Sequence, residues 1–502
     1  MSSCGNPAVE SDALMTRKPK YDKSRTCVRC KENTGNLVIR HAVYCKDCFF
    51  PLITHRFRRS LEPFVNPKPD GPRRTALKPT GDLLIGYSGG LGSAVLLDLV
   101  ARCYVTPDKS LVTAEGGRDH PRKDRVWKKV RVCYVEVCDA FPGMPDRTEE
   151  IRMAVNKYQD LEFIPLRIQD SFDPKFWKST GVSPDQLLQY SLDLGTEDLL
   201  IASTSTSSEP TAALRAYLAA LPTPSALPTI LKTLTRLLLL YTAYSTKSSH
   251  LVLGTSLTSL AVSLITSITQ GGGFHVKEET QEEWRPTYST GTNDFQPSEL
   301  PIRIIRPLRD IGMKECGAWA WWMDVKVVGR EKWVWPGAKS GIGSLTKDFI
   351  VGLEKDYPST VSTIVRTCGK LAPKGEVDGR CILCERPIQE GIQEWHSRIS
   401  IRSRADLTGK SESAPRSISR AQPSLTSLLC YTCHTTLTSR SSRSAPPLYP
   451  GLSVEKKVPL PVWIDARLSE NSLHAGHNEV ITGHFLTEGE KRDALKYYLL
   501  DD

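Results

Sequence analysis

The chain has 502 residues, of which 39% are hydrophobic and 24% charged, and a formal net charge of +10. This composition is typical of a globular protein, and the length allows two or three domains. The most apolar stretch, residues 231–244, includes Lys232 and Arg236 and is too short to cross a membrane, which needs about 20 apolar residues. The positive charge suits a polyanionic partner, although charge determines association rather than fold.

The N-terminal region contains the first cysteine motif. Residues 1–24 are polar and basic and lack the apolar core of a secretory signal, so we expect a disordered N-terminus and a cytoplasmic protein. Residues 25–62 form a module in which two CxxC pairs are separated by 14 residues, the spacing of a Cys4 zinc site. Its expected ligands are Cys27, Cys30, Cys45 and Cys48. Residues 63–80 contain five prolines and are expected to be a linker.

Strands and helices are expected to alternate from residue 81 onwards. Short apolar runs predict strands at 82–87, 129–137, 161–168 and 250–254, and helical spacing predicts helices at 93–104, 149–159 and 256–269. Such an alternation indicates an α/β domain, here residues 81–370, with a parallel sheet and crossover helices on both faces. Residues 203–228 are rich in Ser, Thr, Ala and Pro and are expected to be an insertion.

The C-terminal region, residues 371–440, contains a second cysteine motif. Two further CxxC pairs predict a second zinc site, with Cys381, Cys384, Cys430 and Cys433 as ligands. Although 45 residues separate Cys384 from Cys430, the entropic cost of loop closure grows only logarithmically with length. Residues 399–424 are rich in Ser and Arg and are expected to be a disordered insertion. The tail, residues 441–502, is expected to end in a helix with capping-box spacing at Thr487 and Glu490.

A glycine-rich turn follows the first expected strand of the α/β domain. Residues 88–93 read SGGLGS and precede a helix. A helix N-terminus favours anions, and glycines let the backbone approach a ligand closely. The pattern therefore predicts an ancestral phosphate loop formed by Ser88, Gly89, Gly90 and Ser93; the alternative is an ordinary tight turn.

The SGGxxS pattern resembles the PP-loop of ATP pyrophosphatases, which adenylate a substrate carbonyl oxygen. Together with YCKDCF at 44–49, HRFR at 55–58, HLVLGTS at 250–256, GGGF at 271–274 and IRPL at 305–308, it resembles the cytoplasmic tRNA 2-thiolation protein 2 family. The resemblance implies a PP-loop fold and a subunit that pairs with a catalytic PP-loop tRNA thiolase. It further implies tRNA wobble uridine thiolation (5-methoxycarbonylmethyl-2-thiouridine synthesis) in the cytoplasm, with sulfur from a thiocarboxylated ubiquitin-related modifier, the carrier of protein urmylation.

The same resemblance implies a non-catalytic chain. Active relatives carry an acidic residue where this chain has Gly92, and a GHNxDD motif where residues 254–259 contain no carboxylate. Magnesium on a triphosphate requires hard, preferably charged, oxygen ligands, so whether ATP binds at all is left open. No cysteine lies between Cys138 and Cys316, where catalytic relatives bind an iron–sulfur cluster. Cys138, Cys316 and Cys368 are expected to be small buried hydrophobes.

The basic segment after the first cysteine motif is the expected tRNA contact. Its cations, Arg56, Arg58 and Arg59, would bind phosphates without reading sequence; the alternative is a solvated charged face. Trp319, Trp321 and Trp322 are expected to be core or interface residues. Two other interpretations stay open: a catalytically competent ATP-dependent thiolase, and a zinc-dependent RNA-binding adaptor unrelated to thiolation.

Overall fold

The structure is a computed structural model. It describes residues 26–40, 42–65, 81–105, 126–180, 201–202, 209–286, 301–329, 341–371, 379–389, 391, 428–438, 448–449, 458–459, 461 and 463–464. The predicted disorder of residues 1–24, the insertion at 399–424 and the C-terminal helix lie outside the described residues, as does most of the linker. The domain boundaries drawn from the sequence stay predictions.

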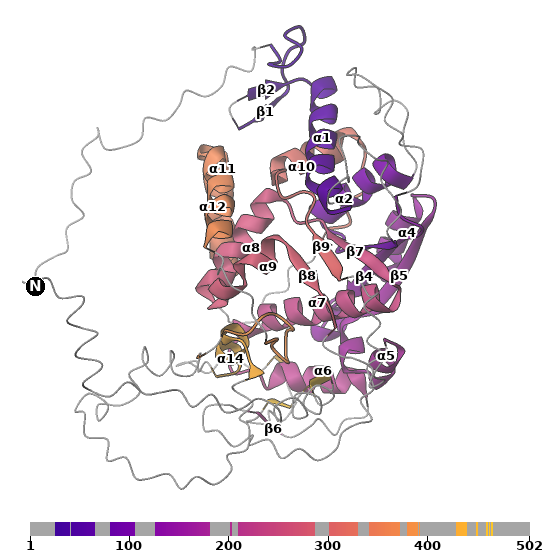
Figure 1. Ribbon diagram of the computed structural model, residues 1–502, viewed down its shortest axis with the longest axis vertical. Helices are drawn as coiled ribbons and strands as arrows, with labels where there is room; N and C mark the ends of the chain where they lie inside the picture. The colour runs from indigo at the N-terminus through magenta and orange to yellow at the C-terminus, as the bar shows by residue number, and fades with distance from the viewer. Residues whose placement is uncertain are drawn as a thin grey trace, which may run out of the picture.

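The centre of the molecule is a six-stranded sheet with the order β5-β4-β3-β7-β9-β8. The pairs from β5 to β9 are parallel, and β8 joins the edge antiparallel to β9. This sheet, with helices packed around it in Figure 1, confirms the predicted α/β fold. Its strands are β3 (Asp82–Tyr87), β4 (Val130–Glu136), β5 (Leu161–Arg167), β7 (Ser248–Leu253), β8 (Glu282–Trp284) and β9 (Ile302–Ile305).

Both faces of the sheet are buried because successive side chains of a strand point to opposite faces. In β3, Leu84 belongs to one hydrophobic cluster, whereas Leu83 and Ile85 belong to the other. The first cluster also contains residues of α5, α6 and α7 and the second cysteine group, and the second cluster contains residues of α1, α2, α4 and α10. Helices therefore cover both faces, as predicted.

The helices occupy these ranges: α1 (Lys46–Val65), α2 (Leu91–Val100), α4 (Thr148–Asn156), α5 (Pro174–Ser179), α6 (Pro210–Ala219), α7 (Ala226–Ser245), α8 (Leu257–Thr269), α9 (Val276–Thr280), α10 (Met313–Trp322), α11 (Ile342–Asp356), α12 (Pro358–Lys370) and α14 (Tyr431–Thr438). A π-helical turn, Ala101–Val105, extends α2, and 3-10 turns occupy Cys138–Ala140, Ile168–Phe172 and Gly272–His275. The remaining strands pair in twos: β1 (Leu37–Ile39) with β2 (Ala42–Tyr44), and β6 (Ile201–Ala202) with β10 (Val458–Pro459). None of the helices in the described part of the chain is long and apolar enough to span a membrane.

Within the expected insertion at 203–228, α6 contributes Leu214, Tyr217 and Leu218 to the core. A packed helix therefore occupies part of this segment. The surrounding Ser, Thr and Pro residues made the helical pattern of its Ala- and Leu-containing half hard to recognise in the sequence.

The chain reverses its direction of travel across the sheet at β3. From β3 it passes outward to β4 and β5, and it then returns to β7 on the other side of β3. In open α/β sheets, ligands bind outside the carboxyl ends of the strands at such a switch point. The glycine loop after β3 and residues 254–256 after β7 leave the sheet at this position, which makes the switch point the place to look for a nucleotide site.

Candidate metal centres and the glycine loop

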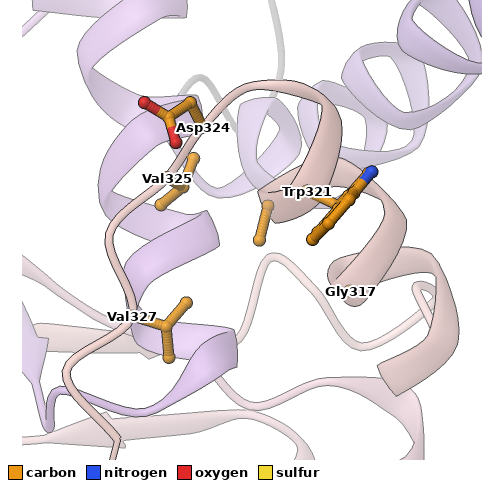
Figure 2. A pocket seen from close by; sticks show the side chains of 6 residues that line it. Gly317, Trp321, Asp324, Val325 and Val327 are labelled. Atoms are coloured by element: carbon orange, nitrogen blue, oxygen red, sulfur yellow. The ribbon is translucent and has the colours of Figure 1, made fainter.

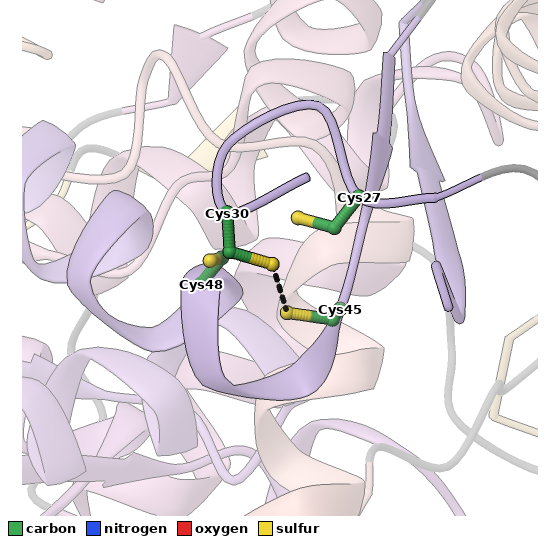
Figure 3. A group of neighbouring side chains, drawn as sticks. All are labelled: Cys27, Cys30, Cys45 and Cys48. Carbon is green, nitrogen blue, oxygen red and sulfur yellow. Dashed lines mark hydrogen bonds between the residues drawn. The ribbon is translucent and has the colours of Figure 1, made fainter. Parts of the chain in front are cut away.

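The first cysteine group lies where the β1–β2 hairpin joins α1. The Sγ atoms of Cys27, Cys30, Cys45 and Cys48 all lie within 4.8 Å of one another, and Figure 3 shows the four side chains converging. Cys27 and Cys45 are buried, whereas Cys30 and Cys48 are half-buried. Burial opposes ionisation of Cys27, but hydrogen bonds from the backbone of Cys30, Cys45 and Arg29 lower the pKa of its thiol to about 6. The thiolate is the form that binds a metal.

The second group brings together cysteines from distant parts of the chain. The Sγ atoms of Cys381, Cys384, Cys430 and Cys433 also lie within 4.8 Å of one another, and all four residues are buried. Hydrogen bonds from the other three thiols hold the pKa of Cys384 well below its ordinary value, despite burial. The structure therefore brings together the predicted ligands in both groups.

The donor sets and spacings fit a tetrahedral ion. Zinc–sulfur bonds of about 2.3 Å give sulfur–sulfur edges of about 3.8 Å in a tetrahedron. The separation is 3.9 Å between the Sγ atoms of Cys30 and Cys45, and 3.6 Å between those of Cys384 and Cys430. Either group could hold a metal such as zinc, and four thiolates would leave no open position for catalysis.

The second group is anchored in the core by the residues that follow Cys384. Buried Glu385 accepts a hydrogen bond from Trp284 Nε1 at 2.6 Å and another from the hydroxyl of Tyr241. Arg386 donates to Glu279 at 2.7 Å, and Arg236 donates to the Cys384 carbonyl oxygen at 2.7 Å. These contacts tie the metal-binding turn to α7, α9 and β8.

The GGGF motif supports the same attachment. Gly271 has a φ of +85°, and a Cβ there would lie 2.6 Å from the ring of Tyr431, which begins α14. Nearby, His275 donates from Nε2 to the Pro387 carbonyl oxygen at 2.8 Å. Because only glycine permits this close approach, the motif allows α14, and with it Cys433, to pack against the end of α8.

The glycine loop has the strand–turn–helix form that the sequence predicts. Gly90 is the N-cap of α2, and the Ser93 hydroxyl donates to the Gly90 carbonyl oxygen at 2.8 Å. The Ser88 and Ser93 hydroxyls are 3.3 Å apart. Gly89 adopts a left-handed conformation, with a φ of +73°. The four predicted loop residues are therefore together at the switch point.

The position of the missing acidic residue is closed by backbone. A Cβ on Gly92 would lie 2.1 Å from the Gly254 carbonyl oxygen, and a Cβ on Gly254 would lie 2.5 Å from the Gly92 carbonyl oxygen and from Ser93 Cα. The two glycines thus let the turns after β3 and β7 touch directly. No side chain fits at position 92 without separating these turns.

The second acidic motif is also replaced by a structural contact. Thr258, which stands at a carboxylate position of GHNxDD, is completely buried. Its hydroxyl donates to Glu354 of α11 at 2.8 Å and accepts from the Met313 backbone N–H at 2.9 Å. This position therefore fastens α8 to α11 and to the start of α10.

The outer side of the loop is covered by the segment after α10. The Gly329 N–H donates to the Gly89 carbonyl oxygen at 2.9 Å, and Arg147 donates to the Val328 carbonyl oxygen at 2.8 Å. A Cβ on Gly89 would lie 2.7 Å from Ile151 of α4. Neighbouring segments therefore pack against the loop from both α4 and residues 325–329.

The basic segment lies on α1, and its three arginines are not equivalent. Arg56 forms an ion pair with Glu315 of α10 at 3.1 Å, so its guanidinium is engaged inside the molecule. Arg58 is half-buried next to Cys103, and Arg59 is exposed. Phe57 and Leu61 of the same helix are fully buried.

The three tryptophans of α10 also differ from one another. Trp319 is fully buried and donates to Asp98 Oδ2 at 2.8 Å, and Trp322 packs against Phe49 and Phe50. Trp321 is 84% exposed. Their helical spacing could have separated Trp321 from the other two. Cys138, Cys316 and Cys368 are buried, as expected.

Known proteins resemble the chain over most of its length. The family model for cytoplasmic tRNA 2-thiolation protein 2 matches residues 341–435, from α11 into α14. The protein of that name from Danio rerio is 27% identical over 73% of this chain and 73% of its own length. The one from Phaeosphaeria nodorum is 26% identical over 74% of this chain and 88% of its own. Among solved structures, a U34-tRNA thiolase from Methanococcus maripaludis with a [4Fe-4S] cluster is 17% identical and covers 75% of this chain and 97% of its own, with a TM-score of 0.43. The family model and the relatives confirm that the chain resembles the cytoplasmic tRNA 2-thiolation protein 2 family, as its motifs predict.

Proposed function

We propose that this chain is a non-catalytic subunit of a cytoplasmic complex that 2-thiolates the wobble uridine of tRNAs, and that it supports a catalytic PP-loop partner. The names of the family model and of the relatives support the pathway. The contact between Gly92 and Gly254 is the main observation that supports the non-catalytic role, because backbone atoms occupy the position where active relatives have a carboxylate.

The rival function is a thiolase that works alone. It would need a magnesium–ATP site at the switch point, and magnesium requires oxygen ligands, usually carboxylates. At the three positions where active relatives carry carboxylates, this chain has Gly92, which has no side chain, Thr258, whose hydroxyl is bonded to Glu354, and Ser259. The sequence also lacks cysteines between Cys138 and Cys316. These features favour a supporting role, in which the glycine loop is a vestige that joins β3 to α2.

An exposed apolar stripe on α11 supports the proposal that this chain binds a partner protein. Ile342, Leu345 and Phe349 are 39%, 55% and 60% exposed and recur at helical spacing along one flank. The neighbouring flank, with Ile350 and Leu353, packs in a cluster with α8 and α12. Contiguous exposed apolar surface marks interaction sites, and this helix begins the region that the family model matches. We assign the stripe to the catalytic subunit.

The remaining parts of the proposal follow the family resemblance. Zinc would fill both cysteine groups, and Arg58 and Arg59 are the two predicted arginines left for tRNA phosphates after Arg56 pairs with Glu315. The sulfur would come from a thiocarboxylated ubiquitin-related modifier and would be received by the catalytic partner.

The partner surface can be tested with matched substitutions. Phe349→Ser should weaken assembly with the catalytic subunit, and tRNA thiolation should fall with it. Met153→Ser on α4 is the control, since Met153 is also 60% exposed but lies away from α11. Co-purification and thiolation of total tRNA measure the two effects. Full assembly and thiolation with Phe349→Ser would show that the stripe is not the interface.

A further inference from the structure

The two cysteine groups differ in how closely solvent can approach their sulfur atoms. In the first cysteine group Cys30 and Cys48 are half-buried, whereas all four cysteines of the second group are buried. The residues between the paired cysteines differ in the same way. Val28, in the first turn of the first group, is 57% exposed, but Ile382, in the corresponding turn of the second group, is 2% exposed. The two groups therefore offer the same ligands but different access to solvent.

Access decides which thiolates an oxidant attacks. A metal site made of cysteines keeps its sulfurs deprotonated, and the thiolate is also the nucleophilic form. Peroxides convert accessible thiolates to sulfenic acids, which condense with a neighbouring thiol to form a disulfide. In reducing compartments such disulfides are transient and serve in catalysis or redox sensing. The first cysteine group has the access that this reaction requires, and the second group does not.

Cys45 is placed to complete the reaction that begins at Cys30. Their Sγ atoms are 3.9 Å apart and are joined by a dashed line in Figure 3. Cys45 is only 3% exposed, so solvent reaches it less than Cys30. Asn33 donates from its backbone N–H to Cys30 Sγ at 3.5 Å and from its side chain to Cys45 Sγ at 3.9 Å. One residue therefore holds both sulfurs next to each other.

We propose that the first cysteine group is an oxidation site, at which hydrogen peroxide converts Cys30 and Cys45 to a disulfide. The Cys30 thiolate attacks one peroxide oxygen, the O–O bond breaks, and a sulfenic acid and a hydroxide form. The Cys45 thiolate then attacks the sulfenic sulfur and displaces a second hydroxide. The pair of sulfurs loses two electrons, which the peroxide oxygens gain. Only Cys27 and Cys48 then remain as ligands, too few for a tetrahedral ion.

The oxidation affects the junction between α1 and α10. Phe49 and Phe50 directly follow Cys48 in the first turns of α1. The ring centroid of Phe49 lies 5.0 Å from that of Trp322, and the ring centroid of Phe50 lies 5.4 Å from that of Trp319. Loss of the metal therefore loosens the end of α1 that carries these two rings, and the environment of both indoles should change.

Trp321 of the same helix provides a contrast. It is 84% exposed, and Figure 2 shows it beside an open groove. Its fluorescence should therefore not respond when α1 loosens.

The test uses the full-length chain loaded with zinc and treated with hydrogen peroxide. A chromogenic chelator measures the released zinc, and mass spectrometry of tryptic peptides locates the disulfide. Trypsin cleaves after Arg29, Lys31 and Lys46, so each cysteine of the first group lies on its own peptide. The proposal rests on the proposed zinc in this group, which elemental analysis before oxidation checks separately.

We expect half of the bound zinc to be released first, together with a disulfide between Cys30 and Cys45, while the second group keeps its zinc. Dithiothreitol and added zinc should reverse both changes. The accompanying change in fluorescence should be retained in Trp321→Phe and reduced in Trp322→Phe.

Cys103→Ala is the matched control, because Cys103 is a half-buried cysteine outside both groups; zinc release should be unchanged. Cys45→Ser removes the second thiol, so Cys30 should accumulate as a sulfenic acid that reacts with dimedone. Equal release from both groups, a disulfide between other cysteines, or full retention of zinc by the treated parent chain would overturn the proposal. So would the absence of dimedone labelling at Cys30 in Cys45→Ser. None of these measurements requires thiolation, so their failure would leave the proposed role in thiolation standing.

Discussion

The contact between Gly92 and Gly254 gives the sharpest prediction about stability. A Cβ at position 92 would lie 2.1 Å from the Gly254 carbonyl oxygen, where ordinary contact begins at 3.4 Å. Gly92→Ala therefore forces two backbone segments apart by roughly 1.3 Å. Both segments are fixed, one at the start of α2 and the other after β7, so neither can yield as a flexible side chain would. Overpacking of this kind costs about 1–3 kcal/mol or more.

Urea unfolding followed by circular dichroism would measure this cost. Gly92→Ala should unfold at a lower urea concentration than the parent chain. In thermal unfolding, each kcal/mol of lost stability should lower Tm by about 2–4 °C in a domain of this size. Gly90→Ala is the matched control in the same loop, because its Cβ would meet only the Ser88 hydroxyl, at 3.5 Å. We expect it to change stability by about 1 kcal/mol or less, since loss of the glycine N-cap offsets the gain in chain entropy.

The same position tests the closed site directly. Gly92→Asp restores the acidic residue of active relatives, but we expect it to destabilise the fold and to produce no ATP turnover. If Gly92→Ala were as stable as Gly90→Ala, the contact with Gly254 would not exclude a side chain at position 92. ATP turnover by Gly92→Asp would refute the steric argument outright.

Two further predictions concern protons and metals. Burial, with a smaller contribution from Arg303, lowers the pKa of His250 to about 4. The unfolded chain binds this proton near pH 6.5, so the stability that neutral His250 provides is complete above about pH 6.5 and is lost as the pH falls to about 4. The loss in the free energy of unfolding is about 3 kcal/mol. Unfolding measured at a series of pH values should show that the stability of His250→Asn depends less steeply on pH than that of the parent chain. An unchanged slope would contradict the role given to His250. For the metals, Cys433→Ser should reduce bound zinc and lower Tm strongly because its group lies inside the core, whereas Cys30→Ser should reduce zinc with a smaller effect on Tm. Elemental analysis and calorimetry measure both, and equal Tm losses would contradict the difference between the two sites.

Much of the sheet could be predicted from local pattern. The strands β3, β4 and β7 are rich in apolar residues and largely buried, as expected of strands covered on both faces. The edge strand β5 has only half-buried and exposed side chains, and its apolar residues still indicated a strand. The N-cap of α8 is Ser256, whose hydroxyl accepts from the Ser259 N–H, and the sequence placed the start of that helix correctly. The cysteine groups were predictable because ligand spacing is a local feature of the chain.

The rest depends on contacts between distant residues. Nothing near Gly271 in the sequence indicates that Tyr431 packs on it, or that Arg386 pairs with buried Glu279. Arg56 was expected to face phosphate, yet Glu315, 259 residues away, engages it. The exposure of Trp321 follows from the packing direction of α10, which composition alone does not fix. The local sequence therefore predicted the helices and strands, whereas the partners of their polar side chains could be identified only from the structure.

The most direct test of the proposed function is a tRNA thiolation assay with the purified chain, ATP and a sulfur donor, with and without the catalytic partner. The account predicts 2-thiouridine in tRNA only when both chains are present, and none from this chain alone at any ATP concentration. Thiolation by this chain alone would contradict the account, because the positions of Gly92 and Thr258 would then not be needed for magnesium and ATP.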